Sequence, residues 1–214
     1  MTATAAPPRP RLRGVLHAIG APIAVVLGLV LILLANTARE RTGVAVYAAS
    51  LIGLFTMSAI YHRGHWRPAV KGWLQRVDHS MIFILIAGTY TPFCLLVLAG
   101  STSWIVLSIV WGGAILGVVT RLTWVNAPKA LFVPLYLALG WVAITVTPAL
   151  AAGASTATNV LLVVGGVLYS VGAIIFATRR PDPFPQVFGF HEVFHALTMA
   201  AAACHAAAIV LVLT

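Results

Sequence analysis

The feature that most constrains this chain is a series of seven apolar runs, each close to the length needed to cross a lipid bilayer. A hydrocarbon core of about 30 Å requires roughly 20 residues of helix. The connections between runs are short and leave no room for a separate soluble domain. The runs are residues 15–35, 44–61, 81–98, 103–120, 130–150, 159–177 and 190–213. The sequence therefore predicts an all-α integral membrane protein, a bundle of seven transmembrane helices.

Composition excludes several other classes of protein. Hydrophobic residues make up 61% of the chain and charged residues only 8%, which is too apolar for an ordinary soluble domain. The net charge of +9 does not indicate nucleic-acid binding, because the basic residues lie in short segments between apolar runs rather than in one patch. Cys94 and Cys204 both fall inside apolar runs, so neither a disulfide framework nor a paired-cysteine metal site is expected.

The distribution of Lys and Arg predicts the orientation of the bundle. Two basic residues, Arg39 and Arg41, fall on one side of the membrane, and the other eleven fall on the opposite side. The eleven are Arg9, Arg11, Arg13, Arg63, Arg67, Lys71, Arg76, Arg121, Lys129, Arg179 and Arg180. The positive-inside rule then places the N-terminus in the cytoplasm and the C-terminus outside, and topology alone accounts for these basic residues. Residues 1–14, "MTATAAPPRPRLRG", are expected to form a short, basic, disordered cytoplasmic tail.

Polar residues gather at the cytoplasmic ends of three predicted helices, in the motifs "SAIYH", "RVDHS" and "HEVFH". The residues are Ser58, His62, Asp78, His79, His191, Glu192 and His195. Residues four apart on a helix face the same way, so Ser58 pairs with His62, and His191 with His195. The three helices can therefore direct these side chains into one bundle interior.

Three imidazoles with an open fourth position are typical of a catalytic zinc site. We predict that His62, His191 and His195 bind Zn²⁺, and that Asp78 and Ser58 hold or polarise its water. Ionisable residues inside a membrane are costly and indicate a functional site. Two alternatives stay open, because the four-residue spacing also arises by chance and because an intramembrane His often serves as an interhelical hydrogen-bond partner.

The remaining polar residues are expected to lie outside the first coordination shell. Glu192 turns about 100° away from His191, which favours a position behind the imidazoles or against a neighbouring helix. His79 is expected at the cytoplasmic interface and, like Glu192, in a position behind the metal ligands. "HEVFH" also satisfies the zinc-protease pattern with Glu192 as general base, but a protease would leave His62 and Asp78 unexplained.

Two further histidines are predicted to be structural. His205 lies about 15 Å deeper than His195 by helical rise, which is too far to share its metal. His205 and His17 are both expected to make interhelical hydrogen bonds. Gly113 and Gly117 have the spacing of a close helix contact.

The order of "SAIYH", "VDHSMIFILIAGTYTPF" and "HEVFH" resembles the hemolysin III family, the bacterial branch of the progestin and adiponectin receptor (PAQR) superfamily. The resemblance covers nearly the whole chain. It implies a seven-helix fold with zinc near the cytoplasmic face, bound by the His of the Ser-x-x-x-His motif and both His of the His-x-x-x-His motif. Those positions are His62, His191 and His195, while Asp78 and Ser58 correspond to the family's water-associated Asp and motif Ser.

The same resemblance implies a function. Related receptors and alkaline ceramidases of the superfamily support hydrolysis of lipid amides, so we expect a zinc-dependent hydrolase of a membrane lipid amide or ester in the bacterial plasma membrane. Such an enzyme would contribute to membrane-lipid homeostasis. The alternatives are a non-enzymatic sensor or regulator with a structural zinc, and a cytolytic protein as the family name suggests. The expected partner is a membrane lipid, and no oligomeric state is predicted.

Overall fold

The computed structural model describes residues 10–124 and 129–214, and the secondary structure of these residues is helical apart from one bridge between Phe184 and Phe188. The elements are α1 (Val15–Leu34), α2 (Ala38–Arg63), α3 (Pro68–Leu96), α4 (Gly100–Thr123), α5 (Lys129–Gly140), the 3₁₀ helix η1 (Trp141–Val146), α6 (Thr147–Gly153), α7 (Thr156–Thr178) and α8 (Phe190–Leu213). Seven stretches of the described chain are long and apolar enough to cross a membrane, and the fifth runs from Leu131 to Gly153. The prediction of an all-α bundle of seven spans is confirmed.

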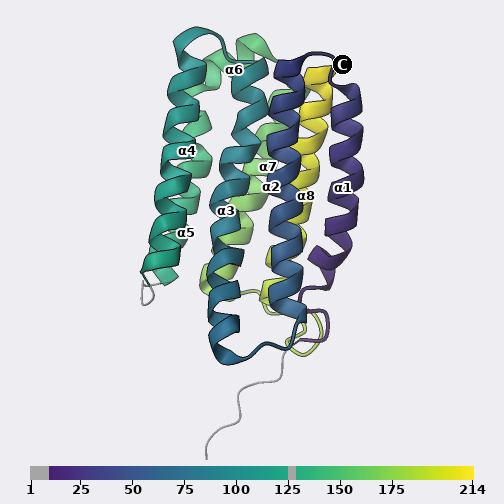
Figure 1. Ribbon diagram of the computed structural model, residues 1–214, viewed down its shortest axis with the longest axis vertical. Helices are drawn as coiled ribbons and strands as arrows, with labels where there is room; N and C mark the ends of the chain where they lie inside the picture. The colour runs from purple at the N-terminus through teal and green to yellow at the C-terminus, as the bar shows by residue number, and fades with distance from the viewer. Residues whose placement is uncertain (1–9, 125–128) are drawn as a thin grey trace, which may run out of the picture.

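Two helices begin more than one turn before the apolar runs indicated. α2 starts at Ala38 rather than residue 44, because Thr37 and Glu40 form a capping box at its first turn. α3 starts at Pro68 rather than residue 81, with the proline in the first turn, where its missing N–H costs nothing. Figure 1 shows α3 reaching beyond α4 at the lower end of the bundle. Hydropathy identifies only the part of a helix that lies in the hydrocarbon core. The polar first turns of α2 and α3 extend beyond that core.

The expected disordered tail needs a correction. Residues 1–9 lie outside the described residues, but residues 10–14 form a turn held by the loop before α8. The Arg11 N–H donates to the Gln186 carbonyl at 2.9 Å, and the Leu12 N–H donates to the Val187 carbonyl at 3.1 Å. These backbone bonds fix the segment that leads into α1.

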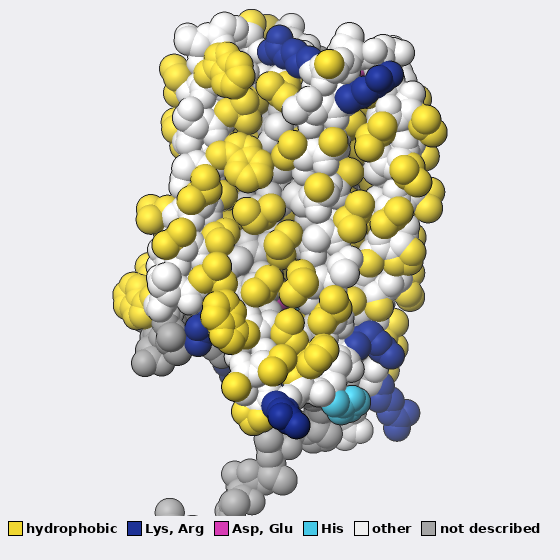
Figure 2. Space-filling view, in the orientation of Figure 1, with side chains coloured by type: hydrophobic (Ala, Val, Ile, Leu, Met, Phe, Trp, Pro, Cys, Tyr) yellow, Lys and Arg dark blue, Asp and Glu magenta, His cyan; other side chains and the backbone are white. Residues whose placement is uncertain are grey.

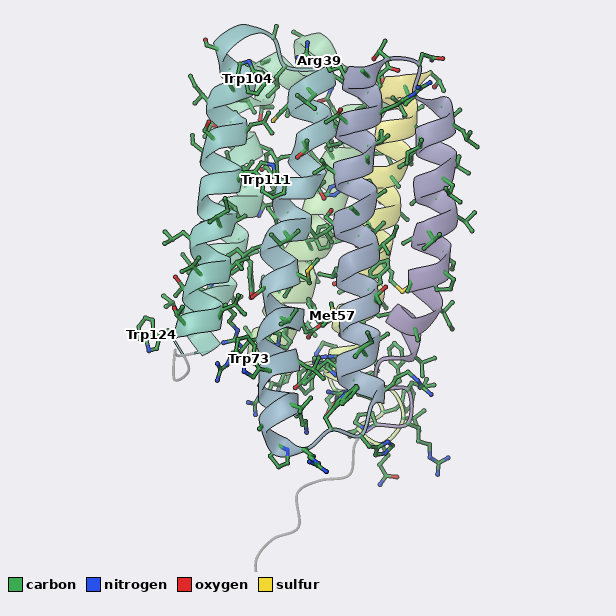
Figure 3. All side chains as sticks on the ribbon, viewed as in Figure 1. Arg39, Met57, Trp73, Trp104, Trp111 and Trp124 are labelled. Carbon is green, nitrogen blue, oxygen red and sulfur yellow. The ribbon has the colours of Figure 1, made fainter. Side chains whose placement is uncertain are left out.

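The outer surface matches a lipid environment. Figure 2 shows hydrophobic side chains covering the middle of the visible face, with Lys and Arg gathered toward its two ends. Trp104 lies near one end of the bundle, and Trp73 and Trp124 lie near the other (Figure 3). All three indoles are more than half exposed. Tryptophan favours the two membrane–water interfaces, so these positions indicate the borders of the apolar band.

Two clusters of buried apolar side chains hold the bundle together. One joins α1, α2 and α8 around residues such as Tyr47 and Leu51. The other joins α3 and α4 to the fifth span, and includes Phe83 and Val110. Gly117 allows the Phe83 ring to lie directly against the backbone of α4, as the small-residue spacing predicted.

The fifth span is broken near its middle, where α5 passes into η1. Backbone that departs from the α-helix in a membrane requires polar partners from the protein itself. The Tyr90 hydroxyl of α3 supplies two, since it donates to the Gly140 carbonyl at 2.6 Å and accepts from the Ala143 N–H at 2.7 Å. Tyr90 therefore stabilises the break.

Replacing Tyr90 with phenylalanine is expected to lower the free energy of unfolding by about 1–3 kcal/mol, because two backbone groups within a membrane span lose their partner. Unfolding of the purified protein in mixed micelles measures the change. Tyr169→Phe is the matched control, since no hydrogen bond of the Tyr169 hydroxyl occurs within the described chain. Equal stability of the two variants would contradict the role assigned to Tyr90.

Candidate metal centre

Three imidazoles converge where the last turn of α2 meets the first turns of α8. One nitrogen from each of His62, His191 and His195 lies within 4.8 Å of the others. The Nε2 atoms of His62 and His191 are 3.1 Å apart. All three side chains are buried, with exposed fractions of 8% or less. The four-residue spacing of α8 thus brings His191 and His195 to one face, toward α2.

Asp78 and Ser58 lie beside this cluster. The Asp78 Oδ2 atom is 3.9 Å from His62 Nε2, and the Ser58 side chain interacts with the Asp78 carboxylate. Asp78 and Ser58 are 7% and 3% exposed. The structure therefore brings together the five residues that the sequence analysis assigned to the zinc ion and its water, out of the seven polar residues at that depth. Met57, the neighbour of Ser58, marks that depth toward the lower end of the bundle in Figure 3.

The imidazole cluster has the donor atoms and spacing that zinc requires. Two nitrogens bound to one tetrahedral zinc are about 3.3 Å apart, given bonds of about 2.0–2.1 Å. The 3.1 Å between His62 and His191 is close to this separation. Their facing Nε2 atoms can share a single cation after a small adjustment, and the Asp78 carboxylate lies 3.9 Å from the His62 Nε2 atom.

Glu192 does not join the cluster, as its position on the helix predicted. Its Oε1 atom accepts from Arg13 Nε at 2.6 Å, and its Oε2 atom accepts from the Gly189 N–H at 2.9 Å. The carboxylate thus caps α8 and pairs with the segment before α1, although it is only 1% exposed. Both oxygens are engaged, which does not favour Glu192 as the general base of a protease.

His17 is a member of the site that the sequence analysis missed. Its ring stacks on His195 with centroids 3.8 Å apart and an interplanar angle of 6°. The side chain is 2% exposed, and neither ring nitrogen has a hydrogen-bond partner within the described residues. The expected interhelical hydrogen bond is therefore wrong, and stacking takes its place. The sequence did contain an indication of this position, because His17 lies at the cytoplasmic end of the first span, at the same end as the other site residues.

His79 and Arg121 also differ from expectation. His79 does not lie at the solvated interface but lines the same cavity as Asp78, half-buried. Its Nδ1 atom is 2.5 Å from Nη2 of Arg121. The sequence analysis explained Arg121 by membrane topology alone. In the structure, however, it is only 7% exposed and lines the cavity as well. Hydropathy gives the depth of a residue but not the side of the helix that it occupies.

A largely apolar cavity extends from the imidazole cluster into the bundle. All seven spans contribute to its walls, from His17 of α1 to His205 of α8. A second cavity continues it toward the far end of the fifth span. The residues common to both are Thr89, Tyr90, Gly140, Trp141, Gly166 and His205. His205 itself makes the expected interhelical contact, with Nε2 3.4 Å from the Leu162 carbonyl.

The comparisons with known proteins agree with this architecture, a seven-helix membrane protein with a buried histidine cluster. The family model described as "Haemolysin-III related" matches residues 6–206. "Hemolysin-3" of Bacillus cereus is 34% identical over 87% of this chain and 84% of its own length. "Hemolysin-3 homolog" of Bacillus subtilis (strain 168) is 33% identical over 87% of this chain and 86% of its own. The chain therefore belongs to the haemolysin III family.

A more distant similarity extends to animals. The human "Monocyte to macrophage differentiation factor" is 26% identical over 80% of this chain and 71% of its own length. The similarity covers most of both chains, so the relationship is not limited to one motif.

Arg13→Gln is expected to lower the free energy of unfolding by about 2 kcal/mol, because the buried Glu192 carboxylate loses its charged partner. Thermal unfolding in detergent measures the loss. Arg11→Gln is the matched control, since the Arg11 side chain is exposed and the backbone bond of Arg11 does not depend on it. If both variants unfold at the same temperature, the ion pair does not anchor the segment before α1.

Proposed function

We propose that this protein is a zinc-dependent hydrolase of a membrane lipid with an amide or ester bond. One observation carries the proposal: a cluster of three imidazoles, two of which belong to His191 and His195 on the wall of a largely apolar cavity, lies beside an Asp78–Ser58 pair on the same wall. A metal site of this composition lies beside a space that suits an acyl chain. This combination accounts for costly polar groups inside a membrane protein.

His62, His191 and His195 are the residues that would hold zinc. Zinc bound by three imidazoles supplies Lewis-acid activation of a water molecule and of a carbonyl group. Structural zinc sites usually have four protein ligands, whereas this cluster offers three within the described residues. The incomplete set favours a site that keeps one position for water or substrate.

Asp78 acts as the general base and acid in this proposal. Its carboxylate takes a proton from the attacking water while the water oxygen bonds to the carbonyl carbon. The bond from that carbon to the amine nitrogen or the alcohol oxygen then breaks, and Asp78 returns the proton to that leaving atom. The products are a carboxylic acid and an amine or alcohol. Ser58 contacts the carboxylate and keeps it oriented.

The cavity determines which part of a lipid reaches the metal. Its walls beyond the cluster carry side chains such as Leu85, Ile86 and Leu137, which pack well against a hydrocarbon chain. An acyl chain lying there places its carbonyl group at the imidazoles. The adjoining second cavity gives the chain room to extend along the fifth span.

The orientation of the protein follows from its basic residues. The loop between α2 and α3 and the helix ends beside it carry Arg63, Arg67, Lys71 and Arg76, and they lie at the same end of the bundle as the start of α1 (Figure 1). The positive-inside rule assigns that end to the cytoplasm. The metal centre would then open toward the cytoplasmic leaflet of a bacterial plasma membrane, where lipid hydrolysis contributes to membrane-lipid homeostasis.

Two alternatives remain testable. A structural zinc would join α2 to α8, and the position of the histidines on these two helices favours that possibility. The name "Hemolysin-3" of a relative suggests cytolysis. A pore, however, needs a continuous polar lining, and the walls of the cavity beyond the cluster are mainly apolar.

Zinc content and lipid turnover of the purified protein separate these alternatives. We expect about one zinc per chain in the wild type and almost none after His191→Ala, because two imidazoles bind the cation too weakly. His205→Ala is the matched control on the same helix and should keep its zinc. Zinc that survives His191→Ala would overturn the assigned ligands.

Asp78→Asn tests the chemistry. We expect zinc to remain while the release of fatty acid from ceramide, lysolipid and phospholipid substrates falls by about 100-fold or more, since an amide cannot relay the proton. Stoichiometric zinc in the wild type without hydrolysis of any of these lipids would contradict the enzymatic proposal and would indicate a structural zinc.

A further inference from the structure

Arg121 is a buried cation in the last turn of α4. Its side chain is 7% exposed, although α4 is one of the predicted membrane spans. A desolvated guanidinium is costly unless oppositely charged or polar groups surround it. The C-terminal end of α4 offsets part of this cost through the negative end of its dipole.

The contacts of Arg121 use only part of its hydrogen-bonding capacity. A guanidinium has five N–H donors. Nη2 faces His79 Nδ1, and the guanidinium lies over the Phe132 ring at 4.7 Å. The Nε atom is buried and has no hydrogen-bond partner in the described part of the chain. The ion pairs found there involve other residues, Arg13 with Glu192 and His62 with Asp78.

His79 orients Arg121 on the cavity wall. Arg121 can only donate, so His79 Nδ1 accepts from its Nη2. The Tyr136 hydroxyl donates to the His79 carbonyl at 3.0 Å, which holds this turn of α3 against α5. Arg121, His79 and Tyr136 all line the cavity.

Buried polar atoms without partners concentrate around this cavity. In the described chain they belong to four residues, His17, Ser80, Arg121 and His205, and three of these line the cavity. Such groups are rare in native proteins and call for a bound partner. Arg121 is the one among them that always carries a positive charge.

We propose that Arg121, supported by His79, is an anion-binding subsite of the cavity that takes the carboxylate or phosphate oxygens of an anionic membrane lipid. The subsite adjoins the imidazole cluster, since the charge of Arg121 acts on the Asp78 carboxylate, but the guanidinium itself contacts His79 and Phe132. Charge-assisted hydrogen bonds from a guanidinium to such oxygens are among the strongest in proteins. The inference rests on the proposed function only in placing a lipid in the cavity, and it requires no metal.

A lipid is the source of the anion because of where Arg121 lies. The walls around it are apolar and aromatic, including Phe132 and Ile82, so a small hydrated anion gains nothing from them. An anion attached to a hydrocarbon chain buries that chain along the cavity and neutralises the guanidinium at once. The Arg121 subsite therefore selects lipids by charge.

Isothermal titration calorimetry in a neutral maltoside detergent tests the subsite with three probes of equal chain length: dodecyl phosphate, dodecanoate and dodecanol. We expect wild-type protein to bind both anions at least about tenfold more tightly than the alcohol. Inorganic phosphate is the probe without a hydrocarbon chain, and it should not compete.

Equal affinity for dodecyl phosphate and dodecanol would overturn the proposal, because it would mean that Asp78 already balances the charge of Arg121. Competition by inorganic phosphate at similar concentration would overturn the assignment to a lipid.

Variants identify the residue responsible. Arg121→Gln should abolish the preference for the anions, whereas Arg121→Lys should retain part of it. Arg76→Gln is the matched control: Arg76 lies on α3 over the Trp73 ring, donates to the Leu122 carbonyl at 3.4 Å and does not line the cavity. It should leave the preference unchanged. If Arg121→Gln does not fold, Arg121→Lys and the wild-type comparison still decide.

The His191→Ala variant separates this subsite from the metal. It should keep the preference for anions, even if the protein proves to have no hydrolase activity. Loss of the preference in His191→Ala, or its survival in folded Arg121→Gln, would show that another group binds the anion.

Discussion

The constraint on which this structure depends is that a membrane interior offers no water to polar groups. Most of the chain meets it in ordinary ways: helices satisfy their own backbone, Tyr90 serves the broken fifth span, and Arg13 pairs with the buried Glu192. The exceptions are informative because most of them lie in one place. Of the four described residues that keep buried polar atoms without a hydrogen-bond partner, His17, Arg121 and His205 line the cavity that begins at the imidazole cluster.

Much of the fold could be predicted from the sequence, because the bilayer fixes the length of an apolar helix. The seven spans were found, and so was the common depth of Ser58, His62 and Asp78 with the histidines of α8. The early start of α3 at Pro68 was not found, since its first turns are polar and hydropathy responds to the surroundings of a helix rather than to helicity. The ordered segment before α1 depends on backbone bonds to residues far along the chain.

In the candidate site, the sequence predicted the membrane depth of each residue, but it did not always predict the direction of the side chain. Periodicity correctly placed His191 and His195 on one face and turned Glu192 away from them. It could not place His17 against His195, because that contact depends on how α1 packs beside α8. Arg121 counted among the basic residues at the helix ends, but the rotation of α4 directs its side chain inward. Packing between helices, which one sequence does not determine, decides both positions.

The central claim is that the histidine cluster is an open zinc site, and zinc-edge X-ray absorption of the purified protein tests it most directly. The account predicts three imidazole nitrogens at about 2.0–2.1 Å and one further oxygen ligand. A spectrum with sulfur ligands, or folded protein that binds no zinc, would contradict it.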